Sequence, residues 1–183
     1  MGWQSITNSY FERRTISLQK LTVEIKESED LESLKHILNS KRLFIDDEIQ
    51  NKYNYIEING KIECGMAYYE YGIKPSVSIE NVRILWIGFG KKIVAIDLYN
   101  GNIILEKELS SIFYELLLDT DQNYLCVICE LNLYCFHHHQ ILWEIGFRDI
   151  ICGFKIINNN KIEIVCNDGE EYLFELNTGQ FKN

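Results

Sequence analysis

Proline is nearly absent from this chain: Pro75 is the single proline among 183 residues, and glycine occurs 11 times. This scarcity excludes a proline-rich linker and a collagen-like chain. Apolar runs long enough to span a membrane are also lacking, and the opening residues MGWQSITNSYFERR contain no apolar stretch typical of a secretory signal. We therefore expect a soluble, cytoplasmic protein.

Catalytic signatures are missing as well. The sequence contains no G-x-S-x-G elbow, P-loop, dinucleotide fingerprint or H-E-x-x-H motif. Gly88-Phe89-Gly90 lies within a predicted strand pair and lacks the following helix that a phosphate loop requires. We expect a protein that is not an enzyme and that binds no cofactor and no metal.

What the chain does contain is apolar material and negative charge. Hydrophobic residues make up 46% of it, which is typical of a globular protein with its own core. The formal net charge is -9, and residues 91–183 account for most of it, with 14 acidic and 7 basic side chains. Such a balance argues against direct binding of nucleic acid, because a phosphate backbone attracts cationic surfaces.

An internal repeat is the main finding. Leu98 to Ile103, Phe136 to Ile141 and Leu176 to Phe181 align at offsets of 38 and 40 residues. Each copy has an apolar strand end, a short polar turn and an apolar restart. Four short antiparallel strands in about 40 residues are the period of a β-propeller blade.

Hairpin registers support this alignment. Two-residue loops at Asn100-Gly101, His138-His139 and Thr178-Gly179 predict apolar cross-strand pairs on one face. The predicted pairs are Leu98 with Ile103, Ile96 with Leu105, Phe136 with Ile141, Tyr134 with Trp143, and Leu176 with Phe181.

The segment DTDQNYLCVICELNLYCFHHHQILWEI resembles one blade of the quinoprotein-like or WD-type β-propellers, and the resemblance covers roughly residues 82–183. Neither a WD dipeptide nor the quinoprotein cofactor residues are present, so the resemblance implies a fold and no catalysis. The fold class predicted is mainly β, with about three antiparallel propeller-blade-like repeats in an incomplete ring, an N-terminal strand, one helix and a hairpin.

Residues 1–75 are expected to form a strand–helix–hairpin segment and residues 76–183 the three repeats, as one compact unit. The strand is predicted over Thr15–Lys26 and the helix over Asp30–Asn39, with Ser28 as its cap. A three-residue loop at Asn59-Gly60 would place Ile58 opposite Ile62 and Ile56 opposite Cys64. We expect this segment to cover the edge that the incomplete last blade leaves exposed.

Two side-chain groups invite a metal interpretation. Cys126 and Cys129 form a C-x-x-C motif, but an offset of three along a strand places the two sulfur atoms on opposite faces. We expect all six cysteines to be reduced and mostly buried. His137 to His139 fall on a hairpin turn, where an exposed polar turn is the favoured interpretation and a pH-sensitive contact patch or a metal site the alternatives.

The function predicted is therefore a non-enzymatic, acidic protein-binding module. Its overall character resembles that of bacterial immunity proteins, which implies an inhibitor that covers the active site of a basic toxin domain such as a nuclease. The predicted partner-binding residues are Asp119, Asp121, Glu130, His138, Asp168 and Glu170. The alternative is a propeller-type scaffold or peptide-docking protein that self-associates through an open sheet edge.

Overall fold

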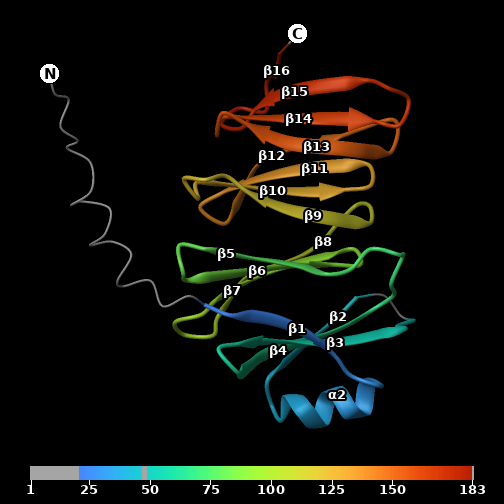
Figure 1. The fold of residues 1–183 in the computed structure, drawn as a ribbon, viewed down its shortest axis with the longest axis vertical. Helices are drawn as coiled ribbons and strands as arrows, with labels where there is room; N and C mark the ends of the chain where they lie inside the picture. The colour runs from blue at the N-terminus through green and yellow to red at the C-terminus, as the bar shows by residue number, and fades with distance from the viewer. Residues whose placement is uncertain (1–20, 47–48, 183) are drawn as a thin grey trace, which may run out of the picture.

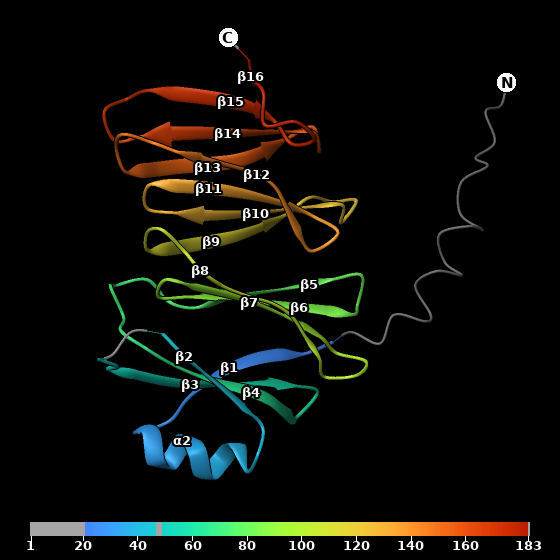
Figure 2. The same cartoon turned by 180° about the vertical axis from the view of Figure 1, so that it is seen from behind.

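The computed structural model describes residues 21–46 and 49–182. These residues form one helix and four four-stranded sheets, which lie one on another in chain order (Figure 1; Figure 2). The predicted fold class is confirmed: the described residues are mainly antiparallel β in blade-like sheets that close no ring. We call these sheets the first to the fourth.

The first sheet contains β1 (Val23–Glu27), β2 (Arg42–Ile45), β3 (Lys52–Ile58) and β4 (Lys61–Tyr68), and α2 (Leu31–Leu38) lies between β1 and β2. The second contains β5 (Ser76–Glu80), β6 (Ile84–Phe89), β7 (Lys92–Asp97) and β8 (Ile103–Glu108). The third contains β9 (Phe113–Leu118), β10 (Tyr124–Cys129), β11 (Asn132–His137) and β12 (Gln140–Gly146). The fourth contains β13 (Ile151–Ile157), β14 (Lys161–Cys166), β15 (Glu171–Glu175) and β16 (Phe181–Lys182).

In the second, third and fourth sheets, strands that follow one another in the sequence are neighbours and run antiparallel. This arrangement is that of a propeller blade. The first sheet departs from it, because its order is β1-β3-β4-β2 and β2 runs parallel to β4. Strands β2 and β5 were not predicted from the sequence.

Three apolar cores hold the sheets together, one at each interface. In β6, Leu85 and Ile87 face the first sheet while Trp86 faces the third. In β10, Val127 faces the second sheet and Ile128 the fourth. Because both faces of these strands are buried, their sequences are continuously apolar instead of alternating. Each fully buried large side chain contributes about 1.5–3 kcal/mol.

Both ends of the stack are closed, by different means. At one end α2 covers the first sheet with Leu34 and Leu38, which lie so close to Gly65 that a Cβ there would come within 2.6 Å of Leu38. At the other end the outer face of the fourth sheet carries cross-strand ion pairs of Lys155 with Glu163 and of Lys161 with Glu175. A polar outer face is typical of the terminal unit in a stacked repeat.

Two of the three predicted hairpin registers are wrong. In the second sheet Ile96 pairs with Ile103 and Ala95 with Leu105, and in the fourth Phe174 pairs with Phe181. The loops there hold four residues, because the Asp97 N–H donates to the Asn102 carbonyl in the second sheet and the Glu175 N–H donates to the Gln180 carbonyl in the fourth. The structurally equivalent residues are therefore Ile96, Phe136 and Phe174, and not Leu98, Phe136 and Leu176.

The third sheet follows the prediction only in part. The two-residue turn at His138-His139 and the pair of Phe136 with Ile141 are confirmed. A bulge then shifts the register, so that Tyr134 pairs with Glu144 instead of Trp143. The sequence carries no local signal for this bulge.

The N-terminal predictions have mixed outcomes. Helix α2 is confirmed, but its N-cap is Asp30, whose carboxylate accepts the Ser33 N–H at 2.7 Å, and not Ser28. The strand starts at Val23, and residues 15–20 of the predicted strand lie outside the described residues. The Asn59-Gly60 loop has two residues and a bulge follows, so Ile58 pairs with Lys61 while Ile56 still pairs with Cys64.

The position of this N-terminal segment also differs from the prediction. It packs on the second sheet, through Ile56, Met66 and Tyr68, and lies at the far end of the stack from the fourth sheet (Figure 1). The expectation that it covers the last blade is therefore wrong. Within the described ranges, no helix has the length and apolarity needed to cross a bilayer.

Candidate functional site

The structure divides the six predicted contact residues between opposite ends of the strands. Asp119, Asp121 and His138 lie at the turns that join β9 to β10 and β11 to β12. Glu130 follows β10 at its other end, and Asp168 and Glu170 lie in the turn between β14 and β15. These residues therefore form two groups and no single site.

The Asp119 carboxylate stabilises the turn between β9 and β10. Its side chain is 3% exposed, and its Oδ1 atom accepts the N–H groups of Asn123 and Tyr124, each at 2.7 Å. This use of a carboxylate in place of a backbone acceptor is typical of Asx turns. Because the carboxylate is already occupied and buried, we place the contact surface elsewhere.

The histidine turn bridges the second and third sheets. His138 is exposed, whereas the Nε2 atom of His139 lies 3.4 Å from the Glu80 carboxylate, which also accepts the Trp86 indole N–H at 2.8 Å. Both turn residues have positive φ, 48° at His138 and 64° at His139. In the part of the chain that the structure describes, no three His, Cys, Asp or Glu side chains cluster as metal ligands would.

The C-x-x-C cysteines face different cores, as the strand geometry predicts. Cys126 lies between the third and fourth sheets, and Cys129 lies between the second and third. Burial raises the pKa of the Cys129 thiol well above its usual range, and a hydrogen bond with Cys135 and burial do the same for Cys126. These thiols behave as small apolar side chains of the cores.

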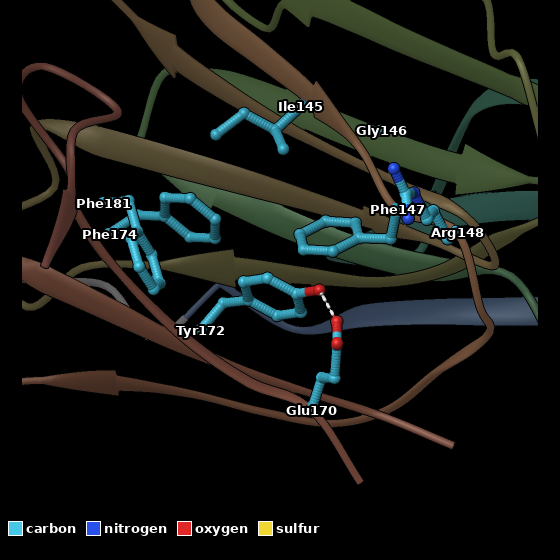
Figure 3. A pocket seen from close by; sticks show the side chains of 8 residues that line it. All are labelled: Ile145, Gly146, Phe147, Arg148, Glu170, Tyr172, Phe174 and Phe181. Atoms are coloured by element: carbon cyan, nitrogen blue, oxygen red, sulfur yellow. Dashed lines mark hydrogen bonds between the residues drawn. The ribbon is translucent and has the colours of Figure 1, made fainter. Parts of the chain in front are cut away.

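A groove of about 360 Å³ lies beside the second group of acids, between the end of β12 and the edge of the fourth sheet. Figure 3 shows its lining side chains converging from three separate chain segments. They are Ile145, Gly146, Phe147, Arg148, Glu170, Tyr172, Phe174 and Phe181. Four of these eight residues are aromatic. We call this feature the aromatic groove.

Local structure explains how the rings meet. Tyr172 and Phe174 alternate on β15, so both face the third sheet, and Phe181 pairs with Phe174 across the hairpin. Phe147 is placed by its N–H, which donates to the Leu131 carbonyl at 2.8 Å. Its ring meets Tyr172 edge-on, with the ring centres 5.3 Å apart. The outermost ring, Phe181, is 49% exposed.

An acidic side chain lies at one end of the groove. The Tyr172 hydroxyl donates to the Glu170 carboxylate, and this hydrogen bond, aided by burial, raises the pKa of Tyr172 to about 12. Burial raises the pKa of Cys166, and the charges of Asp168, Asp149 and Glu170 raise it further. Glu170 is therefore in contact with a ring of the groove, while Asp168 and Asp149 add negative charge around the neighbouring thiol. Among the described residues that line the groove, Arg148 is the one basic side chain.

The acidic residues of this site could be predicted from the sequence, and its aromatic rings were not. Glu170 and Asp168 were predicted from charge, but Phe147, Tyr172 and Phe181 were not. The signal available was the Tyr172-x-Phe174 alternation and the aromatic restart at Phe181. That signal also fits ordinary core residues, and only the packing of the fourth sheet on the third shows that part of each ring meets solvent.

The comparisons with known proteins concern the fold alone. No family model and no curated protein matches the sequence. The computationally designed protein Ika4 has a TM-score of 0.50 at 15% identity, with 62% of this chain and 73% of that chain covered. The β-propeller domain of Swd1 (Cps50) from Myceliophteria thermophila gives 0.49 at 15% identity, over 62% of this chain and 38% of that one.

A third similar structure is Sqt1 from Saccharomyces cerevisiae, with a TM-score of 0.49 and 15% identity over 61% of this chain and 33% of that chain. The matched part thus spans about a third of Swd1 and of Sqt1. At 15% identity, the likeness to Ika4 concerns the fold and says nothing about ligands or partners.

Proposed function

We propose that this protein is a non-enzymatic protein-binding module whose aromatic groove receives an apolar, basic segment of a partner. The observation that carries the proposal is the combination of partly exposed aromatic rings with the Glu170 carboxylate, which lines the groove, and with the nearby charges of Asp168 and Asp149. Partly exposed Tyr and Phe rings are enriched at protein interfaces, where they anchor a partner's apolar side chain. The carboxylates add attraction for a basic partner.

The charge of the whole chain favours the same partner. The net charge is -9, and 14 of the 27 acidic residues lie in residues 91–183, which contain only 7 basic ones. A field of this sign speeds the capture of a cationic protein and slows that of nucleic acid. The aromatic groove lies within this acidic half of the chain.

The finer form of the proposal is a cytoplasmic inhibitor of the immunity type, which neutralises a basic toxin domain such as a nuclease by covering its active site. An acidic surface suits this role because a nuclease site is shaped to attract phosphates. The partner to test first is any basic, toxin-like domain encoded next to this gene. Co-expression should restore the growth that such a domain arrests.

Matched variants make this test specific for the groove. Glu170→Lys and Glu108→Lys each change the net charge from -9 to -7 (the loss of -1 plus the gain of +1), but only Glu170 lines the groove. Phe181→Ser is matched by Ile104→Ser, an exposed apolar residue on the edge strand β8. We expect the groove variants to weaken partner binding about tenfold or more, or about 1.4 kcal/mol. Equal rescue by all four variants, or binding unchanged at high salt, would contradict the proposal.

A second candidate function is a scaffold that self-associates through an open sheet edge. The exposed residues Ile141 and Leu142 on the edge strand β12 favour it, because apolar edge strands tend to pair with other chains. Light scattering after size exclusion distinguishes the two: a stable dimer at low micromolar concentration supports self-association, and a monomer supports the binding module.

A further inference from the structure

Strand β12 is an edge strand that lacks the usual protection. It is the outermost member of the third sheet, so among the described strands it has a partner on one side only. Because the Phe147 N–H points to β11 and backbone directions alternate along a strand, the N–H and C=O groups of Glu144 and Gly146 point outward. These groups form a template for one more strand.

The outer edge strands of the second and fourth sheets differ from β12, and β16 (Phe181–Lys182) has only two residues to offer for pairing. The second half of β8 is Glu106-Lys107-Glu108, and charges of this kind discourage pairing with another strand. Strand β12 has one charged residue, Glu144, and its side chains Ile141 and Leu142 are 39% and 44% exposed. Its bulge lies near Leu142, so the stretch from Trp143 to Gly146 remains regular.

The aromatic groove begins where this free edge ends. Trp143 and Ile145 face the fourth sheet, and Ile145 and Gly146 line one side of the groove, with Tyr172 and Phe181 opposite (Figure 3). A strand added beside β12 would lie about 4.8 Å further out, and stacked sheets lie about 10 Å apart. Its side chains on that face would therefore point into the groove.

We propose that a partner segment binds as a fifth strand on β12, with an apolar side chain between Ile145 and Phe181 and basic side chains beside Asp168 and Glu170. In this mode main-chain hydrogen bonds supply affinity and the groove supplies specificity for alternate side chains. The inference rests on the proposed binding function and specifies how the groove is used.

The experiment uses a seven-residue peptide with acetylated and amidated ends that carries leucine at positions 3 and 5, lysine at positions 1 and 7 and threonine at the even positions. Because alternate residues of a strand share a face, its leucines and lysines all point toward the groove. Two N-methylated versions carry the methyl groups on alternate residues, in opposite frames. In an added strand only one frame has its N–H groups directed at β12, so methylation in that frame should weaken binding about tenfold or more, and in the other frame less than twofold. Titration calorimetry with the full chain measures both.

Hydrogen exchange supplies the internal control. Bound peptide should slow exchange at Glu144 and Gly146 and leave the free edge of β8 unchanged. Binding with equal affinity in both methylation frames, and without protection of β12, would overturn strand addition while leaving the groove a binding site. A peptide that does not bind at all, together with toxin capture that ignores Glu170→Lys and Phe181→Ser, would overturn the proposed function itself.

Discussion

Gly88 marks the closest approach between the second and third sheets, and its replacement by alanine tests the stack directly. A Cβ at this position would lie 2.2 Å from Phe113 Cε2, 2.3 Å from Cζ and 2.7 Å from Cδ2. The Phe113 ring is 1% exposed and belongs to the core between these sheets. It cannot move aside without displacing its neighbours.

The magnitude follows from two opposing effects. Inserting a methyl group into a filled core costs up to about 3 kcal/mol. Replacing glycine by alanine also restricts the unfolded chain, which returns about 0.4–1 kcal/mol. We therefore expect Gly88→Ala to lower the free energy of unfolding by about 2 kcal/mol. Urea denaturation followed by circular dichroism measures the change through the midpoint and the slope.

Gly146→Ala is the matched control, because its new methyl group would meet nothing closer than Asn132 Nδ2 at 3.5 Å, an ordinary contact. It should stay within about 0.5 kcal/mol of the parent protein. In the Gly88→Ala background, replacing the Phe113 ring by the smaller leucine side chain (Phe113→Leu) should recover at least about 1 kcal/mol of the free energy of unfolding, because the effects of substitutions at contacting residues are coupled. Equal stabilities of the two alanine variants would refute the close packing of the second sheet on the third.

Three further predictions test other parts of the molecule. Leu34→Ala should cost about 2–5 kcal/mol by urea denaturation, because Leu34 is fully buried where α2 covers the first sheet. In the native protein a thiol reagent at pH 7.5 should label Cys152 alone of the six cysteines, since the other five are buried. Burial also raises the pKa of the Cys64 thiol to about 12, which keeps it protonated. Labelling of Cys126 or Cys135 without denaturant would contradict this prediction. Hydrogen bonds from the Arg83 guanidinium lower the pKa of Asp97 below its usual value. The contribution of the Asp97 carboxylate to stability is therefore complete above the usual pKa and is lost as the pH falls through the lowered pKa. The variant Asp97→Asn should accordingly lose less stability than the parent protein between pH 5 and pH 3, as measured by urea denaturation.

Secondary structure could be predicted from sequence wherever burial is unambiguous. Strands such as Ile84–Phe89 and Tyr124–Cys129 have both faces in a core, which their continuously apolar sequences indicate. Strand β5 was missed because SVSIE is half-buried and polar at every second residue. Strand β2 was missed because it pairs in parallel with β4, which lies about twenty residues further along the chain, and no local hairpin pattern marks such a pairing.

Register was harder to predict, because bulges and loop lengths depend on contacts outside the hairpin. At the β7–β8 turn, Asp97 accepts the Tyr99 N–H and pairs with Arg83, and these bonds favour a four-residue loop over the Asn-Gly turn. In the third sheet the histidine turn has two residues, and the Nδ1 atom of His137 lies 2.9 Å from the Asn123 carbonyl oxygen. Neither contact can be derived from the hydrophobic pattern of the strands.

The way the stack is closed restricts where a partner can bind. Three interfaces are filled by apolar cores, α2 covers one end, and ion pairs cover the outer face of the other. What is left to solvent is therefore mainly turns and strand edges. Among the outer edges that the structure describes, β8 is charged and β12 is apolar, and β12 ends at the aromatic groove, whose opposite wall includes Phe181 of the two-residue edge strand β16. A partner that needs both main-chain pairing and a side-chain anchor finds them together at this place, which is why the proposed function and the proposed binding mode depend on the same short stretch, Trp143 to Phe147.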